Sequence, residues 1–200
     1  PSGMSRGRLS YTTSWDTIGI RLSPQEIRNC INEGPLLELV RKCNDNEHWR
    51  NCFGPKSTRQ KDQELILRFM AMFEKGEQYR RPMRDFLNDF AAEFNKQPKD
   101  KLDALKSAFE GAVKLCWEAK GKHVFRPSRA LNAAVFESVM LGVAKRLASG
   151  PDAPNASFVA EAYDRLMEDK SYMRSCERAT ADEETVKNRH ELAVRAFAGV

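Results

Sequence analysis

The chain has 200 residues, of which 41% are hydrophobic and 30% are charged, and its 33 basic and 28 acidic residues give a net charge of +5. This composition, with a mean hydropathy of −0.61, is typical of a globular protein with one sizeable core or two small ones. No apolar run approaches the roughly 20 residues that cross a bilayer, so we expect no membrane partner.

Cysteine usage bears on the cellular compartment. The five cysteines are odd in number and irregular in spacing, which excludes the disulfide framework of a small secreted protein. The first ten residues, PSGMSRGRLS, lack the apolar segment of a secretory signal. We therefore expect reduced thiols and a cytoplasmic location.

The first predicted elements are an irregular lead and a short helix. Residues 1–20 include LSYTTSW, which has a β-type composition but few neighbouring strands to pair with. We expect this lead to be irregular, with an α-helical domain over 21–200. Ser23, Pro24 and Glu26 then predict a helix start by capping, and Gly34 marks the stop.

Helical periodicity continues along the rest of the chain. Short helices are predicted at 36–40 and 47–52, and an apolar helix over 57–75 is expected near the centre of the fold because its hydrophobic residues cover most of its circumference. Further segments with spacings of three and four residues predict helices at 82–94, 99–120, 131–147, 158–166 and 182–198. We predict an all-α fold, a single bundle of about seven to nine helices.

The sequence contains none of the common catalytic signatures, such as GxxxxGK[ST], GxGxxG, GxSxG or HExxH. The spacing of Cys43, His48 and Cys52 superficially suggests a metal site, but structural zinc normally requires four ligands, so we expect thiols, no metal and no cofactor. His190 shares a helical face with core residues, which favours a packing role over that of a nuclease histidine.

Several basic residues are candidates for contact with anions. Arg68 interrupts the apolar run LILRFMAMF, and pairing with Glu64 is favoured over an anionic ligand. Two local clusters, one of Arg80, Arg81 and Arg84 and one of Lys120, Lys122, Arg126 and Arg129, are explained either as solvated surface or as phosphate contacts of a DNA-binding face.

Three stretches occur together in an order and spacing that carry a family resemblance: LSPQEIRNCI at 22–31, KDQELILRFMAMFEKGEQY at 61–79 followed by RDFLNDF at 84–90, and FRPSRALNAAVFE at 125–137. Over about residues 18–195 the chain resembles the helical part of the GmrSD-like, modification-dependent restriction proteins of phage defence. Members of that family begin with a ParB/sulfiredoxin-like nucleotidase domain with a DGQQR-type motif, and some end in an HNH nuclease domain. This sequence contains no DGQQR, and where the family has an RxNTGG-like turn it reads SWDTIGIRLS.

The resemblance implies a non-catalytic helical domain that supports an absent nucleotidase domain or partner subunit and can contact DNA, within a parent family of NTP-dependent endonucleases. It also implies that residues 1–20 form the seam to that absent N-terminal domain. The alternatives are a stand-alone protein-interaction adaptor, which could self-associate, and a residual nucleotidase or nuclease. No catalytic residue is assigned. The candidate DNA or domain contacts are Arg28, Asn29, Arg68, Arg80, Arg81, Arg84, Arg126 and Arg129.

Overall fold

The computed structural model describes residues 22–150 and 152–198, and within these ranges it contains ten α-helices, two short 3-10 turns and no strand. The all-α prediction is confirmed for the described residues. The bounds are α1 Pro24–Ile31, α2 Pro35–Asn44, α3 Glu47–Phe53, α4 Lys61–Lys75, η1 Gly76–Gln78, α5 Met83–Phe94, α6 Lys99–Lys120, η2 Gly121–His123, α7 Ala133–Ala148, α8 Ala156–Glu168, α9 Lys170–Glu177 and α10 Glu183–Ala198.

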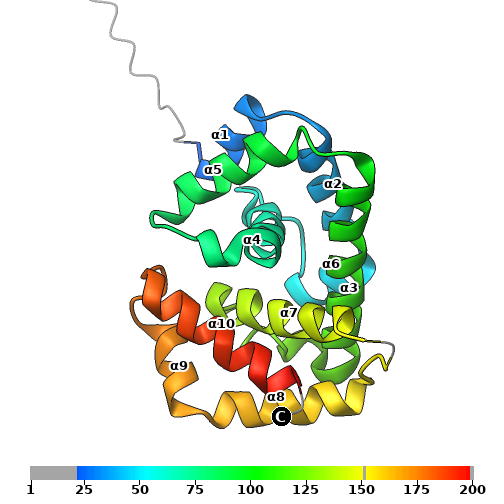
Figure 1. The fold of residues 1–200 in the computed structure, drawn as a ribbon, viewed down its shortest axis with the longest axis vertical. Coiled ribbons are helices and arrows are strands. Elements are labelled where there is room, and N and C mark those ends of the chain that lie inside the picture. The colour runs from blue at the N-terminus through cyan, green and yellow to red at the C-terminus, as the bar shows by residue number, and fades with distance from the viewer. Residues whose placement is uncertain (1–21, 151, 199–200) are drawn as a thin grey trace, which may run out of the picture.

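The helices form two groups joined by the longest one (Figure 1). In one group α1, α2 and α5 surround α4, and in the other α7, α8, α9 and α10 pack together. Helix α6 runs along the side of the molecule and contacts α2 at one end and α8 at the other. The main hydrophobic core joins the two groups, with contributions from Leu36, Phe69, Phe109, Phe136 and Tyr172 on five different helices.

Helix α7 is the most enclosed element. Every residue from Ala134 to Ala144 is buried, so this helix has no solvent face along three turns. Its partner α10 approaches closely at Gly142, where an added Cβ would lie 2.5 Å from Phe197 Cδ2 and 2.9 Å from the carbonyl oxygen of Ala193. The expected central helix, α4, is also buried over most of its length, but α7 lies deeper.

Helix α1 begins as its capping signals predict, because Ser23 and Glu26 form a reciprocal capping box. Its orientation differs from what its apolar spacing suggests. Ile27 and Ile31 are 46% and 66% exposed, whereas Gln25 and Arg28 are buried. Polar side chains therefore attach this helix to the bundle, and an apolar face remains on the outside.

The prediction of seven to nine helices is too low. The missed helix is α9, KSYMRSCE, whose sequence is largely polar and whose buried face consists of Tyr172, Ser175 and Cys176. Its periodic signal is weak because a serine occupies one of the three buried positions. Asp169 is the C-cap of α8 and the N-cap of α9. Helix α9 therefore begins where we expected a loop.

Two further expectations concern the chain as a whole. The predicted irregular lead over 1–20 lies outside the described residues. Among the residues that the structure does describe, none of the helices combines the length and the apolar character needed to cross a bilayer.

Candidate nucleic-acid interface

A depression of about 670 Å³ lies where the end of α3 meets η2 and the loop that follows it. None of the residues lining it is acidic, whereas four can carry a positive charge. We call this site the basic depression. It is lined by Asn51, Cys52, Phe53, Gly54, Lys122, His123, Arg126, Pro127, Ser128 and Arg129.

Arg126 fixes the shape of the basic depression. Its guanidinium donates hydrogen bonds to the carbonyl oxygens of Cys52, of Phe53 at 2.8 Å and of Lys122 at 2.8 Å. The carbonyls of Cys52 and Phe53 end α3 and have no partner within the helix, so an arginine at this position satisfies them. The loop is thereby held against α3.

The remaining basic side chains of the basic depression have no carboxylate as an ion-pair partner. Lys122, His123 and Arg129 are exposed, and none of the three forms an ion pair with an Asp or Glu side chain of the described residues. Lys122 and Arg129 are thus two unpaired cations on an exposed loop, and such groups can bind the oxygens of phosphate groups.

The second basic cluster of the sequence is neutralised locally. Arg80 lies 3.9 Å from Glu183, and Arg81 lies 3.4 Å from Asp182. Arg84 pairs with its neighbour Asp85 at 2.8 Å. Of the two clusters, only the one around residues 122–129 keeps unpaired positive charge in the described structure.

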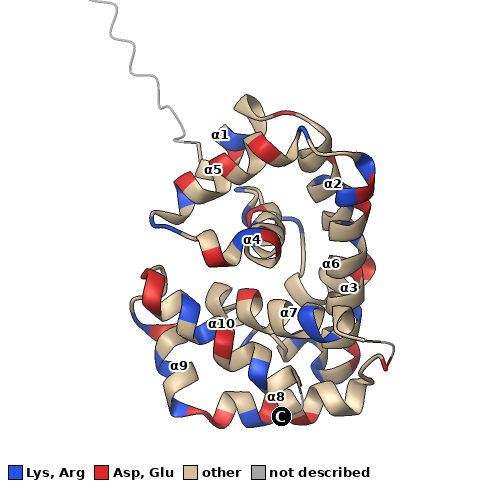
Figure 2. Ribbon diagram, viewed as in Figure 1, with Lys and Arg blue, Asp and Glu red and all other residues tan. Residues whose placement is uncertain are grey.

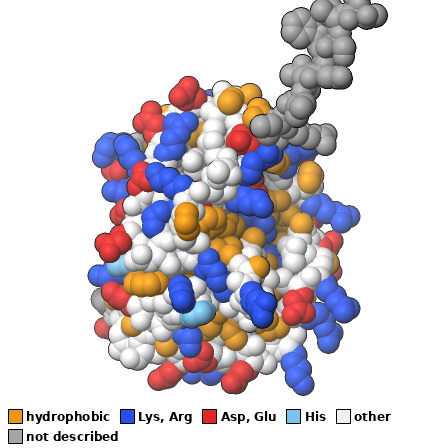
Figure 3. All heavy atoms as spheres, turned by 180° about the vertical axis from the view of Figure 1, so that it is seen from behind, with side chains coloured by type: hydrophobic (Ala, Val, Ile, Leu, Met, Phe, Trp, Pro, Cys, Tyr) orange, Lys and Arg blue, Asp and Glu red, His pale blue; other side chains and the backbone are white. Residues whose placement is uncertain are grey.

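The distribution of charge over the whole molecule is mixed. Figure 2 shows acidic and basic residues alternating along most helices. On the opposite side of the molecule, Figure 3 shows acidic side chains mostly toward the edges, while basic and hydrophobic side chains occupy the middle of that face. A site for an anion therefore depends on local groups of unpaired cations, because the net charge is not concentrated on one helix.

Lys120, which the sequence groups with the cluster around residues 122–129, belongs elsewhere. Its ammonium group is 2.6 Å from Asp164 on α8 and also lies over the ring of Tyr163. Lys120 does not line the basic depression.

Arg28 and Asn29 occupy positions different from those expected of contact residues. Arg28 is 1% exposed and donates hydrogen bonds to Gln25, to Asn88 Oδ1 at 2.9 Å and to the carbonyl of Arg84. Asn29 donates to the side chains of two glutamines at the start of α4. In this structure both side chains tie α1 to its neighbours, and Arg28 does not reach the surface.

Arg68 belongs to a cluster of charged side chains around the buried Glu137. Its guanidinium pairs with Glu137 on α7, not with Glu64 one turn away. Glu137 is fully buried and also accepts from Arg189 at 3.1 Å and from Nε2 of His190 at 2.7 Å. Burial alone would raise the pKa of Glu137, but Arg68, His190 and Arg189 outweigh it and hold this pKa well below its usual range. We call these four residues the Glu137 cluster.

Glu137 and Arg189 were not among the candidates from sequence, although one signal was present. Glu137 is an isolated carboxylate in the apolar run AAVFESVMLGVA, and a buried carboxylate requires a partner. The partners come from α4 and α10, and no local pattern identifies them. The expected packing role of His190 agrees with its 8% exposure.

The three residues with metal-like spacing remain separate. Within the described ranges no group of three or more His, Cys, Asp or Glu side chains could hold a metal ion. Cys43 and Cys52 are buried, and desolvation raises the pKa of each thiol to about 12.

Searches with the chain found no matching family model, no matching curated protein and no matching solved structure.

Proposed function

We propose that this chain is a non-catalytic helical domain of a GmrSD-like restriction or anti-phage defence protein, and that it contacts the DNA backbone through the basic depression. The family part of the proposal is supported by the three ordered sequence stretches. The DNA part is supported by one observation, the lining of the depression by four cationic or titratable side chains without a carboxylate.

The arrangement suits phosphate contact more than base recognition. Arg126 is held by three carbonyl oxygens, so its charge is fixed at the edge of the depression. Lys122 and Arg129 are exposed and end in charged groups on long side chains, which can reach phosphates on either side of a groove. Contacts of this kind position a protein on DNA and carry no sequence information.

The test is fluorescence anisotropy of a labelled duplex across a series of salt concentrations. Contact through about three cations predicts a log–log slope of about −3, since each phosphate neutralised contributes about −0.9. Lys122→Ala and Arg129→Ala are each expected to reduce the magnitude of the slope by about 1. The matched controls are Arg80→Ala and Arg81→Ala, which remove the same charge from carboxylate-paired positions.

Two results would count against the DNA contact. One is the absence of binding at low salt, which would leave only a scaffolding role. The other is an equal loss of affinity in the control variants and in Lys122→Ala and Arg129→Ala, which would indicate a general effect of net charge and no localised site.

A second candidate function, a protein-interaction adaptor that self-associates, is favoured by the outer face of α1. Leu22, Ile27 and Ile31 are the three large hydrophobic side chains found exposed among the described residues, at 53%, 46% and 66%. Exposed apolar side chains gathered on one short segment mark contact surfaces. Sedimentation velocity over a concentration series tests this candidate: a dimer that disappears in the double variant Ile27→Ser/Ile31→Ser supports it, and a monomer at every concentration refutes it.

A further inference from the structure

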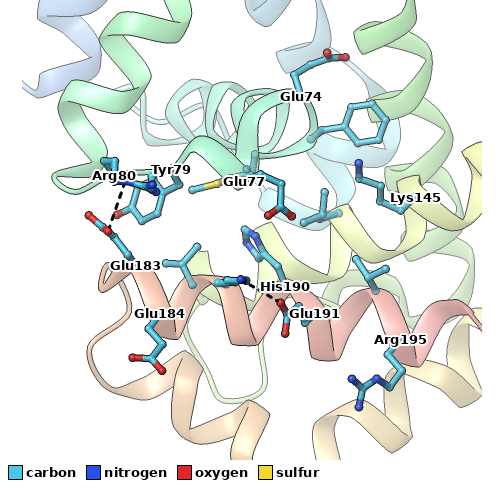
Figure 4. Close-up of a pocket in the computed structure, with 17 residues that line it drawn as sticks. Glu74, Glu77, Tyr79, Arg80, Lys145, Glu183, Glu184, His190, Glu191 and Arg195 are labelled. Atoms are coloured by element: carbon cyan, nitrogen blue, oxygen red, sulfur yellow. Dashed lines mark hydrogen bonds and ion pairs between the residues drawn. The ribbon is translucent and has the colours of Figure 1, made fainter.

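A groove of about 770 Å³ separates the end of α4 and η1 from α10, with α7 behind it (Figure 4). Its floor is apolar, with Met72, Leu141 and Val186 each less than 5% exposed. Charged side chains stand along both walls. A groove of this volume, with an apolar floor and charged walls, can hold a small molecule that has an apolar body and a charged group. We call it the α4–α10 groove.

One nearly buried polar side chain points into the α4–α10 groove. His190 rises from α10 toward η1 (Figure 4), and its Nδ1 lies 4.0 Å from the position that a Cβ on Gly76 would occupy. Nδ1 has no hydrogen-bond partner among the described residues. It is also not one of the fully buried polar atoms that lack a partner, so it keeps some exposed surface. The atom is therefore reached from the groove.

The Glu137 cluster determines what Nδ1 can bind. The carboxylate of Glu137 is ionised and accepts hydrogen bonds from Arg68, Arg189 and Nε2 of His190. Nε2 must therefore carry a hydrogen, and in the neutral imidazole Nδ1 is then an acceptor. A ligand group that approaches Nδ1 of this neutral form of His190 therefore donates a hydrogen bond.

Charge around Nδ1 favours a cationic donor. In Figure 4 the carboxylate of Glu77 points from η1 into the groove and toward the imidazole, and this carboxylate has no ion pair or hydrogen bond among the described residues. The nearby Arg80 and Lys187 face Glu183 and Glu191 at 3.9 Å and 4.0 Å. Glu77 is thus left as an unpaired negative charge opposite an acceptor nitrogen.

The opposite end of the groove differs in charge. Lys145 lies over the ring of Phe73 at 5.2 Å, and Arg195 stands beyond it in Figure 4. Lys145 and Arg195 therefore lie away from Glu77 and His190, and at the η1 end the nearby Arg80 and Lys187 face carboxylates, so an ammonium group is best accommodated there.

We propose that the α4–α10 groove binds a small organic cation, with a primary ammonium group between His190 Nδ1 and Glu77 and an apolar body on the floor formed by Met72 and Val186. The ammonium donates one hydrogen bond to Nδ1 and pairs with the Glu77 carboxylate. This inference does not depend on DNA contact, because no residue lines both the groove and the basic depression.

The probe is 4-phenylbutylamine, compared with 4-phenylbutyrate, which has a similar apolar body and the opposite charge. Binding is followed by NMR of the imidazole nitrogens at pH 7.5. The chain has three histidines, so His48→Gln and His123→Gln assign the His190 signals without disturbing the Glu137 cluster. We expect saturable binding of the amine with an upfield shift of His190 Nδ1, and no saturation with the acid.

Two variants localise the site. Glu77→Gln removes the carboxylate that faces Nδ1, and we expect it to weaken amine binding about tenfold, which corresponds to one lost charged contact. Glu184→Gln is the matched control, since it changes the same charge at an exposed position whose side chain points away from His190 in Figure 4. We expect less than about a twofold effect from it.

Three outcomes would overturn the proposal: no saturation with the amine up to millimolar concentration, equal binding of the amine and the acid, or amine binding that leaves His190 Nδ1 unshifted. An equal effect of Glu77→Gln and Glu184→Gln would do the same, because it would show only general attraction to an acidic surface. The DNA affinity of Glu77→Gln, measured in parallel, is expected to stay at the wild-type value.

Discussion

Arg189 on α10 and Glu137 on α7 form an ion pair of 3.1 Å in which neither side chain is exposed to solvent. Arg189 also donates to the carbonyl oxygens of Ser175 at 2.9 Å and Thr180 at 3.2 Å. The pair therefore joins α7 and α10 to α9 and to the connection that follows α9. Such a pair offsets its desolvation cost through its hydrogen bonds. Because the buried Nε of Arg189 already lacks a partner among the described residues, loss of a further bond adds to the cost of burying this guanidinium.

Glu137→Gln is expected to destabilise the fold by about 3–5 kcal/mol, because it leaves the buried guanidinium of Arg189 and the partly buried one of Arg68 without a carboxylate. Urea unfolding followed by circular dichroism measures the loss. The control is Glu93→Gln, which breaks the partly exposed pair with Lys75 and should cost less than about 1 kcal/mol. Equal losses in the two variants would contradict the assigned role of Glu137.

The same carboxylate gives the protein a specific acid sensitivity. The pKa of Glu137 is lowered in the folded state, so its contribution is fully present above the unfolded pKa of about 4.3 and is lost as pH falls from there toward the folded pKa. We expect the difference in unfolding free energy between wild type and Glu137→Gln to shrink as the pH falls below about 4. A difference that grows on acidification would contradict this sign.

Gly142→Ala is expected to destabilise the fold by about 1–3 kcal/mol through overpacking, because the new methyl group would meet the Ala193 backbone as well as Phe197. Gly111→Ala is the matched control within another helix. There the nearest atom is the Leu147 Cδ1 at 3.2 Å, a flexible end that can move, and alanine favours the helix by about 1 kcal/mol. Thermal unfolding should show a lower Tm than wild type for Gly142→Ala and a higher Tm for Gly111→Ala.

Thiol reactivity should distinguish one cysteine from the other four. Cys30 is exposed, and Cys43, Cys52, Cys116 and Cys176 are buried. Burial raises the pKa of each of these four thiols, which lowers the reactive thiolate fraction further. Labelling with a chromogenic disulfide reagent at pH 8 should modify one thiol rapidly in the native protein and all five in urea, and Cys30→Ser should remove the rapid phase.

Arg28→Ala tests whether this residue has a structural role or contacts DNA. Its removal leaves Gln25 and Asn88 without the buried donor that they now share, and we expect a loss of about 1–3 kcal/mol in unfolding free energy. The salt slope of DNA binding should be unchanged. A slope reduced by about 1 with unaltered stability would instead place Arg28 at the DNA.

The sequence by itself determined the fold class and most helix boundaries. Capping by Ser23 and Glu26, and apolar spacings of three and four residues, act within one or two turns of a helix, so they can be read without knowledge of the fold. The same local reading missed α9, whose buried positions include a serine, and it did not identify Ile27 and Ile31 as exposed side chains.

Only the tertiary structure decided which charged residues are free and which are paired. The partners of Glu137 are 52, 53 and 69 residues away in the chain, and Arg126 satisfies carbonyls 74 and 73 residues before it. The sequence does not distinguish the roles of Arg80, Arg126 and Arg28. In the structure Arg80 faces a carboxylate, Arg126 holds a loop against α3, and Arg28 is buried. The physical reason is that charge pairing depends on distances of a few ångströms, and for residues far apart in sequence those distances are set only when the helices pack.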